Sequence, residues 1–105
     1  MIDQATIQKA VEILRDAARP RKIILFGSYA RGDAREGSDL DFLVVEDRVA
    51  SRRREMVRLD DALGKLRIPA DVLVASREQF DEGKDCRGTV YHQAARHGRV
   101  VYESP

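Results

Sequence analysis

Residues 27–45 read GSYARGDAREGSDLDFLVV, and this segment carries the strongest structural signal in the chain. It follows a short apolar, β-branched run at residues 22–26 (KIILF), which is typical of a buried strand. Gly27 and Ser28 then stand where this strand passes into a short helix. The segment ends in a run that is polar at its start and apolar at its end, which predicts a second strand over residues 38–45.

Helices are expected on both sides of these strands. Upstream, apolar residues recur at helical spacing over residues 3–18, which predicts an amphipathic helix. Downstream, Ser51 is a plausible N-cap of a helix whose apolar residues fall on one face. Pro69 ends that pattern, and residues 70–75 (ADVLVA) predict a third strand.

The C-terminal part of the chain predicts one more helix and one short strand. The helix is expected over residues 87–96 and is capped by Gly98, and the strand over residues 100–102. The expected fold class is therefore α+β (mixed α/β), with a small mixed β-sheet covered by helices.

Length and composition narrow the functional class. The chain has 105 residues, which predicts a single domain over residues 1–105. Charged residues make up 35% of it, yet the formal net charge is only +1, so no membrane or direct nucleic-acid partner is expected. Cys86 is the only cysteine, which excludes an internal disulfide and a thiolate metal site. Without a signal-peptide pattern or a long apolar run, a cytoplasmic location is expected.

Gly27 and Ser28 have the chemistry of a phosphate-binding turn. The start of a helix offers backbone N–H groups and the positive end of the helix dipole to an anion. Glycine allows the backbone to approach the anion closely, and the serine hydroxyl can donate to the same oxygens. The turn is not a Walker A loop, because no Gly-Lys-Ser/Thr follows it.

Three aspartates predict a metal site. Asp39 and Asp41 are two residues apart on the expected second strand, so both carboxylates project from one face. Two adjacent carboxylates repel, and Mg²⁺ is the natural cation to hold them together with substrate phosphates. Asp71 opens the third strand, where it can lie beside this pair. Such a set is what a two-metal site for phosphoryl or nucleotidyl transfer needs.

The same residues resemble the signature of the polymerase-beta-like nucleotidyltransferase superfamily, and more narrowly that of the minimal nucleotidyltransferases (MNT proteins). The MNT pattern is G-S-x-x-R-G, a short loop, S-D-x-D and an apolar strand, followed later by a carboxylate that Asp71 matches. Its fixed positions are all present here: Gly27, Ser28, Arg31, Gly32, Ser38, Asp39 and Asp41. The resemblance implies a small mixed sheet with helices on it and transfer of an NMP group from a nucleoside triphosphate such as ATP.

The resemblance also implies roles for single residues. Gly27 and Ser28 would hold the β and γ phosphates, and Asp39 and Asp41 a metal that bridges the triphosphate. Asp41 and Asp71 would hold a second Mg²⁺ at the acceptor hydroxyl, and Asp71 could also take up the proton of that hydroxyl. Arg31 could bind phosphate or hold its own turn against an acidic neighbour.

The sequence alone does not identify the molecule that accepts the nucleotide. The smallest members of the family resemble antitoxins that are paired with helical HEPN-domain ribonuclease toxins, and some adenylylate a tyrosine of the toxin. This implies a HEPN toxin as partner, and an acceptor site that is shallow or supplied by another chain. The alternatives are transfer to a small molecule such as an aminoglycoside, or an antitoxin that blocks its toxin sterically without catalysis.

Two further patterns have simpler explanations. The run Arg52-Arg53-Arg54 resembles a nucleic-acid patch but is explained by a solvated helix face with acidic residues close by. Arg87 and His92 match the R-x4-H ribonuclease motif, which we interpret as coincidence, because HEPN domains are entirely helical.

Overall fold

A computed structural model describes residues 1–105, and its fold confirms the predicted α+β class. The chain forms helices, strands and one 3-10 turn in this order: α1 (Gln4–Ala18), β1 (Lys22–Phe26), α2 (Ser28–Arg31), β2 (Leu40–Glu46), α3 (Arg52–Leu63), η1 (Gly64–Leu66), β3 (Ala70–Ser76), α4 (Arg77–Gly83), α5 (Val90–His97) and β4 (Arg99–Glu103). None of the helices is long and apolar enough to cross a membrane.

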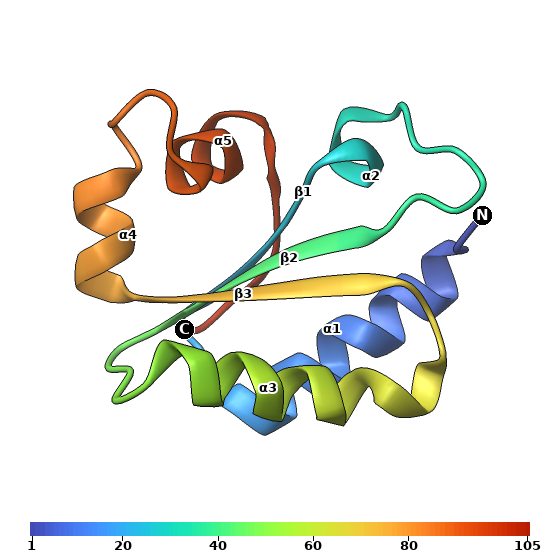
Figure 1. The fold of residues 1–105 in the computed structure, drawn as a ribbon, viewed down its shortest axis with the longest axis horizontal. Helices are drawn as coiled ribbons and strands as arrows, with labels where there is room; N and C mark the ends of the chain where they lie inside the picture. The colour runs from blue at the N-terminus through green and yellow to red at the C-terminus, as the bar shows by residue number, and fades with distance from the viewer.

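The four strands form one mixed sheet in the order β3-β2-β1-β4 (Figure 1). The β2 and β3 strands run parallel, because α3 connects them as a crossover. The β1 strand is antiparallel to both of its neighbours, β2 and β4. This arrangement leaves β3 and β4 at the two edges of the sheet.

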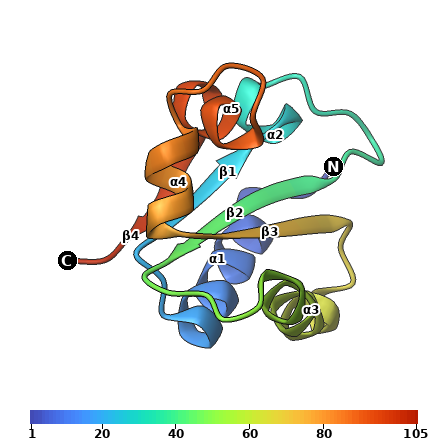
Figure 2. The ribbon, with the colours of Figure 1, turned by 60° about the vertical axis from the view of Figure 1, so that its left-hand side comes forward.

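Helices cover both faces of the sheet, and each face has its own apolar cluster (Figure 2). Alternate side chains of the strands point to opposite faces. Phe42 and Val72 therefore pack in the larger cluster with α1 and α3, whereas Phe26 and Leu43 pack in the smaller one with Phe80 of α4. The central strands β1 and β2 are nearly continuous apolar runs because both of their faces are buried.

Several boundaries differ from those predicted. The second strand begins at Leu40 instead of residue 38, so Asp39 precedes it. The last helix begins at Val90 instead of residue 87, because Gly88 has a positive φ of 88° and the Thr89 side chain caps the helix by accepting from the backbone N–H of His92. The α4 helix was not predicted; it begins with a capping box formed by Ser76 and Gln79.

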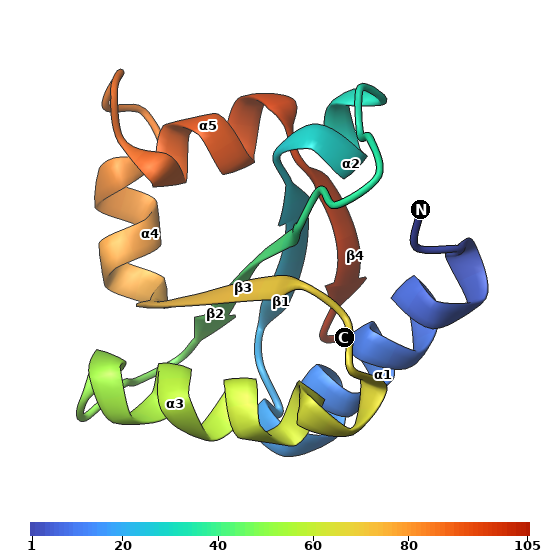
Figure 3. The same ribbon diagram turned by 45° about the vertical axis from the view of Figure 1, so that its right-hand side comes forward.

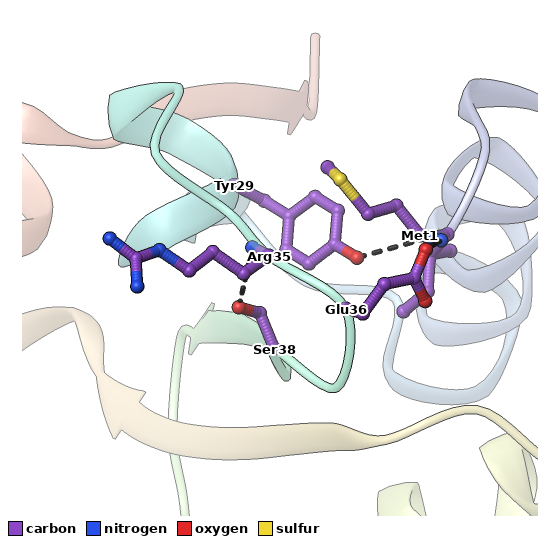
Figure 4. A network of polar contacts seen from close by, with 6 residues as sticks. Met1, Tyr29, Arg35, Glu36 and Ser38 are labelled. Atoms are coloured by element: carbon purple, nitrogen blue, oxygen red, sulfur yellow. Dashed lines mark hydrogen bonds and ion pairs between the residues drawn. The ribbon is translucent and has the colours of Figure 1, made fainter.

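The segment between α2 and β2 is tied to the start of α1 (Figure 4). The backbone N–H of Ile2 donates to the Tyr29 hydroxyl at 3.0 Å, and the Met1 amine pairs with Glu36 at 2.7 Å. Within the segment, the Arg35 N–H donates to Ser38 Oγ at 2.9 Å. Tyr29 also packs against the larger apolar cluster, so it holds this segment in place.

The half-buried carboxyl of Glu46, at the end of β2, makes stability depend on pH. Burial, and then the neighbouring Glu55 carboxylate, raise the pKa of Glu46 to about 8 from the ordinary 4.5, and Glu46 Oε2 is buried without a hydrogen-bond partner. The unfolded chain loses this proton near pH 4.5, whereas the folded chain keeps it until about pH 8. Glu46 therefore lowers the free energy of unfolding progressively as the pH rises through this window.

Glu46→Gln should therefore stabilise the protein at high pH, because the amide never ionises. We expect a melting temperature about 5 °C or more above wild type at pH 9, the shift that about 1 kcal/mol produces at this size, and little difference at pH 5. Thermal unfolding at the two pH values measures it, with exposed Glu82→Gln as the matched control. An equal effect of Glu46→Gln at both pH values would contradict this account.

Candidate active site

The sheet brings the motif residues together at one end. In the parallel β2–β3 pair, Asp41 lies directly opposite Asp71, and in the antiparallel β1–β2 pair, Phe26 lies opposite Asp41. Because Phe42 and Val72 point to the face with α1 and α3, Asp41 and Asp71 point to the other face, which α4 and α5 cover. The turn after β1 therefore lies next to the carboxylate of Asp41.

A cleft of about 500 Å³ opens at this end of the sheet, which is within the range of small-molecule sites. Its walls come from β1, α2, β2, α3, β3 and α5, and its lining residues are Phe26, Gly27, Ser28, Arg31, Asp41, Met56, Asp60, Asp71, Val72, Leu73 and Gln93. Five of the six residues predicted for the site thus line one cavity. Asp39 is the exception: it is exposed and lies outside the lining.

The backbone of Gly27 lies close against the carboxylate of Asp41. Its φ of 76° and ψ of −154° belong to a region that is almost restricted to glycine. A Cβ atom at this position would overlap Asp41 Oδ2. The motif glycine therefore allows the chain to turn from β1 into α2 and lets the Asp41 carboxylate lie against the backbone of the turn.

Ser28 and Arg31 lie at the two ends of α2 and both line the cleft. The first turn of a helix leaves backbone N–H groups without acceptors inside the helix, which suits a phosphate next to Ser28. Arg31 Nε lies 3.4 Å from Asp33 Oδ2 in a half-exposed ion pair. Arg31 thus holds an acidic neighbour and faces the cleft as well, so neither of its two predicted roles excludes the other.

The carboxylates of the site repel one another. Burial raises the pKa of Asp41, and the charges of Asp71 and Asp39 raise it further, whereas Arg31 lowers it. Asp39 therefore interacts with Asp41 although it lies outside the cleft lining. Arg31 offsets only part of the negative charge of these aspartates, and this favours a cation beside them.

The donor set suits Mg²⁺ that is completed by a substrate. No group of three or more His, Cys, Asp or Glu side chains is close enough to hold a metal ion alone. Mg²⁺, however, binds through one or two carboxylates and takes its other ligands from water and substrate phosphates. The facing pair Asp41 and Asp71, next to a phosphate-binding turn, meets this requirement.

Two polar cleft residues were not predicted. Asp60 of α3 lines the cleft, and burial followed by the charges of Asp71 and Asp61 raises its pKa. Helical spacing could have indicated Asp60, because it lies four residues after Met56 and so shares its side of the helix. Gln93 of α5 also lines the cleft, and no sequence pattern distinguishes it.

Comparison with known proteins identifies the family of the chain. Residues 7–95 match the family model described as "Nucleotidyltransferase domain". A Methanocaldococcus jannaschii protein named "Putative protein adenylyltransferase" is 35% identical over 104 residues, which cover 97% of this chain and 100% of that protein. A second protein of this organism with the same description is 46% identical over 41 residues, covering 39% of this chain and 41% of that protein.

Solved structures share the fold at lower identity. A crystal structure described as a "putative nucleotidyltransferase" from Sulfolobus solfataricus has a TM-score of 0.65 at 19% identity, covering 94% of this chain and 78% of that chain. A Shewanella oneidensis complex of a tri-AMPylated HEPN toxin with its MNT antitoxin gives 0.56 at 20% identity, covering 98% and 74%. A toxin–antitoxin complex with AMP-PNP gives 0.57 at 22%, covering 98% and 75%. The family match and the full-length relative show that the chain is an enzyme of the nucleotidyltransferase domain family.

Proposed function

We propose that the protein is a Mg²⁺-dependent adenylyltransferase that moves AMP from ATP to a tyrosine hydroxyl of a HEPN toxin, and so acts as the antitoxin. The observation that carries this proposal is the pairing of Asp41 with Asp71 across parallel strands, beside the Gly27–Ser28 turn and within one cleft. The named adenylyltransferase relative and the toxin–antitoxin complexes of the same fold support the acceptor class.

Different residues of the chain have different roles in AMP transfer. The backbone of Gly27 and the hydroxyl of Ser28 bind the β and γ phosphates, and Arg31 adds positive charge at the same wall. Asp41 and Asp71 would hold Mg²⁺ together with the triphosphate, and Asp39 would add its negative charge next to Asp41. When bound, the ion neutralises the triphosphate and the charge that develops at the α-phosphorus. Positioning and neutralisation of charge supply most of the rate enhancement.

Asp71 lies on the acceptor side of the pair. It opens the edge strand β3 and is exposed, so a hydroxyl of a second protein can approach it from solvent. The hydroxyl oxygen attacks the α-phosphorus of ATP in line and forms the new P–O ester bond. The bond between the α-phosphorus and its bridging oxygen breaks, pyrophosphate leaves, and the hydroxyl proton passes to the Asp71 carboxylate.

Intact-mass spectrometry of the partner tests this proposal. The protein is incubated with its HEPN partner, ATP and Mg²⁺, and the partner should gain about 329 Da for each AMP, a figure fixed by nucleotidyl transfer. The gain should disappear when EDTA replaces Mg²⁺ and when tyrosine is replaced by phenylalanine in the modified peptide.

Other outcomes distinguish the alternatives. If no nucleoside triphosphate adds mass while the Asp39→Asn, Asp41→Asn double variant still suppresses toxicity, the protein is a steric antitoxin and the catalytic proposal is wrong. If an aminoglycoside gains the nucleotide and the partner does not, the acceptor is a small molecule. Mass gain in EDTA would contradict the dependence on metal.

A further inference from the structure

The first turn of α3 carries three arginines in succession, Arg52, Arg53 and Arg54. A helix N-terminus is the positive end of the dipole, so cations in this turn cost helix stability. Ser51 caps the helix by accepting from the Arg54 N–H, and this cap works with any side chain at positions 53 and 54. The helix itself therefore gives no reason for arginine here.

Packing accounts for only one of the three. Arg52 Nε donates to the Val74 carbonyl at 2.9 Å, which joins α3 to the edge strand β3. Arg53 and Arg54 are exposed and form no ion pair or side-chain hydrogen bond. One turn later, Arg58 is held by Glu55 through contacts of 2.7 and 2.8 Å. Arg53 and Arg54 are thus the uncompensated cations of this helix.

These arginines surround an exposed apolar side chain. Val57 is 54% exposed, and helical spacing places Arg53, Arg54, Asp60 and Asp61 around it, three or four residues away in each direction. A shallow groove follows this surface, which we name the basic face of α3, and its lining residues are Ser51, Arg53, Arg54, Val57, Arg58 and Asp61. In Figures 1 and 3, α3 lies at the edge of the molecule, and Val57 belongs to neither apolar cluster.

The basic face borders the candidate active site. Met56 and Asp60 of the same helix line the cleft, and Asp60 is also a neighbour of Val57. From Arg53 to Asp60 the helix rises by about 10 Å. A macromolecule lying along α3 can therefore contact the arginines while it places a side chain beside Asp71.

We propose that the basic face of α3 is the docking surface for the acceptor protein, and that this protein presents an acidic patch about 10 Å from its acceptor hydroxyl. The inference rests on the proposed function, because it needs an acceptor that is a macromolecule. Arg53 and Arg54 contact the acidic patch and Val57 packs at its centre, which agrees with the enrichment of arginine at protein interfaces. The docked partner then brings its hydroxyl into the cleft from the α3 side.

The surface chemistry favours a protein over a nucleic acid. Asp61 lines the same groove as the arginines, Asp60 lines the adjoining cleft, and both would repel a phosphate backbone that followed the helix. The exposed Val57 offers apolar contact area without an aromatic ring for base stacking. An acidic protein patch can pair locally with Arg53 and Arg54 and avoid both aspartates.

Peptides of defined charge test the docking surface. Each probe is a fluorescent 20-residue peptide with one tyrosine and, about 10 Å from it, either four glutamates or four lysines. Anisotropy at low salt measures binding without ATP, and mass spectrometry measures AMP transfer with ATP and Mg²⁺. The glutamate peptide should bind about tenfold more tightly than the lysine peptide, and this preference should shrink as salt is added.

The variants for this test reverse the charges of the basic face. Arg53→Glu, Arg54→Glu should invert the preference, so that the lysine peptide binds more tightly. Acidic side chains suit the first turn of a helix, so the double variant should fold at least as stably as wild type. The matched control is Arg19→Glu, Arg87→Glu, which makes the same change in net charge at exposed positions outside the cleft and the basic face, and should leave the preference unchanged.

The outcomes separate the docking surface from the proposed function. Equal binding of the two peptides by wild type, no binding of either, or an unchanged preference in the Arg53→Glu, Arg54→Glu protein would overturn the docking surface. So would a 20-nucleotide RNA that binds wild type more tightly than the glutamate peptide and is lost in that variant. Inverted binding without AMP transfer to any acceptor would support the docking surface and contradict the proposed function instead.

Discussion

Replacing Asp41 with asparagine should reduce AMP transfer by about 1000-fold or more while leaving the folded protein at least as stable as wild type. Asp41 lies between Asp71 on β3 and the Gly27 backbone, so it is the carboxylate best placed to join the metal to the bound triphosphate. Loss of several kcal/mol of charge stabilisation at the transition state corresponds to this factor. Asparagine keeps the shape of the side chain and removes its charge.

The stability part of this prediction follows from charge repulsion. In the apo protein, burial and the charges of Asp71 and Asp39 disfavour the ionised form of Asp41 and raise its pKa. A folded-state pKa above the unfolded value means that ionisation destabilises the protein as the pH rises. The neutral amide escapes this cost, so the melting temperature at pH 7 should be equal or higher.

Single-turnover transfer assays and thermal unfolding measure the two parts of the Asp41→Asn prediction. Exposed Asp85→Asn, in the link between α4 and α5, is the matched control and should change neither quantity. Activity above about one tenth of wild type would show that Asp41 is not a metal ligand in the reaction. Substantial unfolding of the variant would assign the carboxylate a structural role.

The local parts of the site could be predicted from the sequence because they lie within one short segment. A turn after an apolar strand, followed by two aspartates at strand spacing, predicted the family and the fold class, and both are confirmed. One boundary in this segment was predicted wrongly: β2 begins at Leu40, so Asp39 immediately precedes the strand. Periodicity identifies a strand more reliably than its first residue.

The remaining parts depend on contacts between distant segments. The register that sets Asp41 opposite Asp71 comes from the α3 crossover, and no local pattern encodes which residue of β3 meets which residue of β2. Asp60 and Gln93 enter the cleft because α3 and α5 pack beside the sheet at particular rotations. The α4 helix was not predicted because only Phe80 of its seven residues is buried, and one buried residue gives no apolar periodicity.

Replacing Gly27 with alanine should damage both stability and transfer. The backbone at Gly27 has φ 76° and ψ −154°, where a residue with a Cβ costs about 1–3 kcal/mol. The added Cβ would also overlap Asp41 Oδ2, so the carboxylate must move. Because displacement of a reacting group by about 1 Å can cost about 100-fold in rate, we expect a loss of at least that size.

Two comparisons make this last prediction specific. Gly64→Ala is the matched control, because Gly64 has right-handed helical φ and ψ angles and open space around its Cα, so alanine there should be neutral or slightly stabilising. In a background of Asp41→Ala, the overlap is relieved and only the backbone strain remains. Gly27→Ala should therefore lower the melting temperature by less in that background than in wild type. An equal cost in both backgrounds would attribute the effect to the turn alone, and a Gly27→Ala protein with wild-type stability and transfer would contradict the fit between this glycine and Asp41.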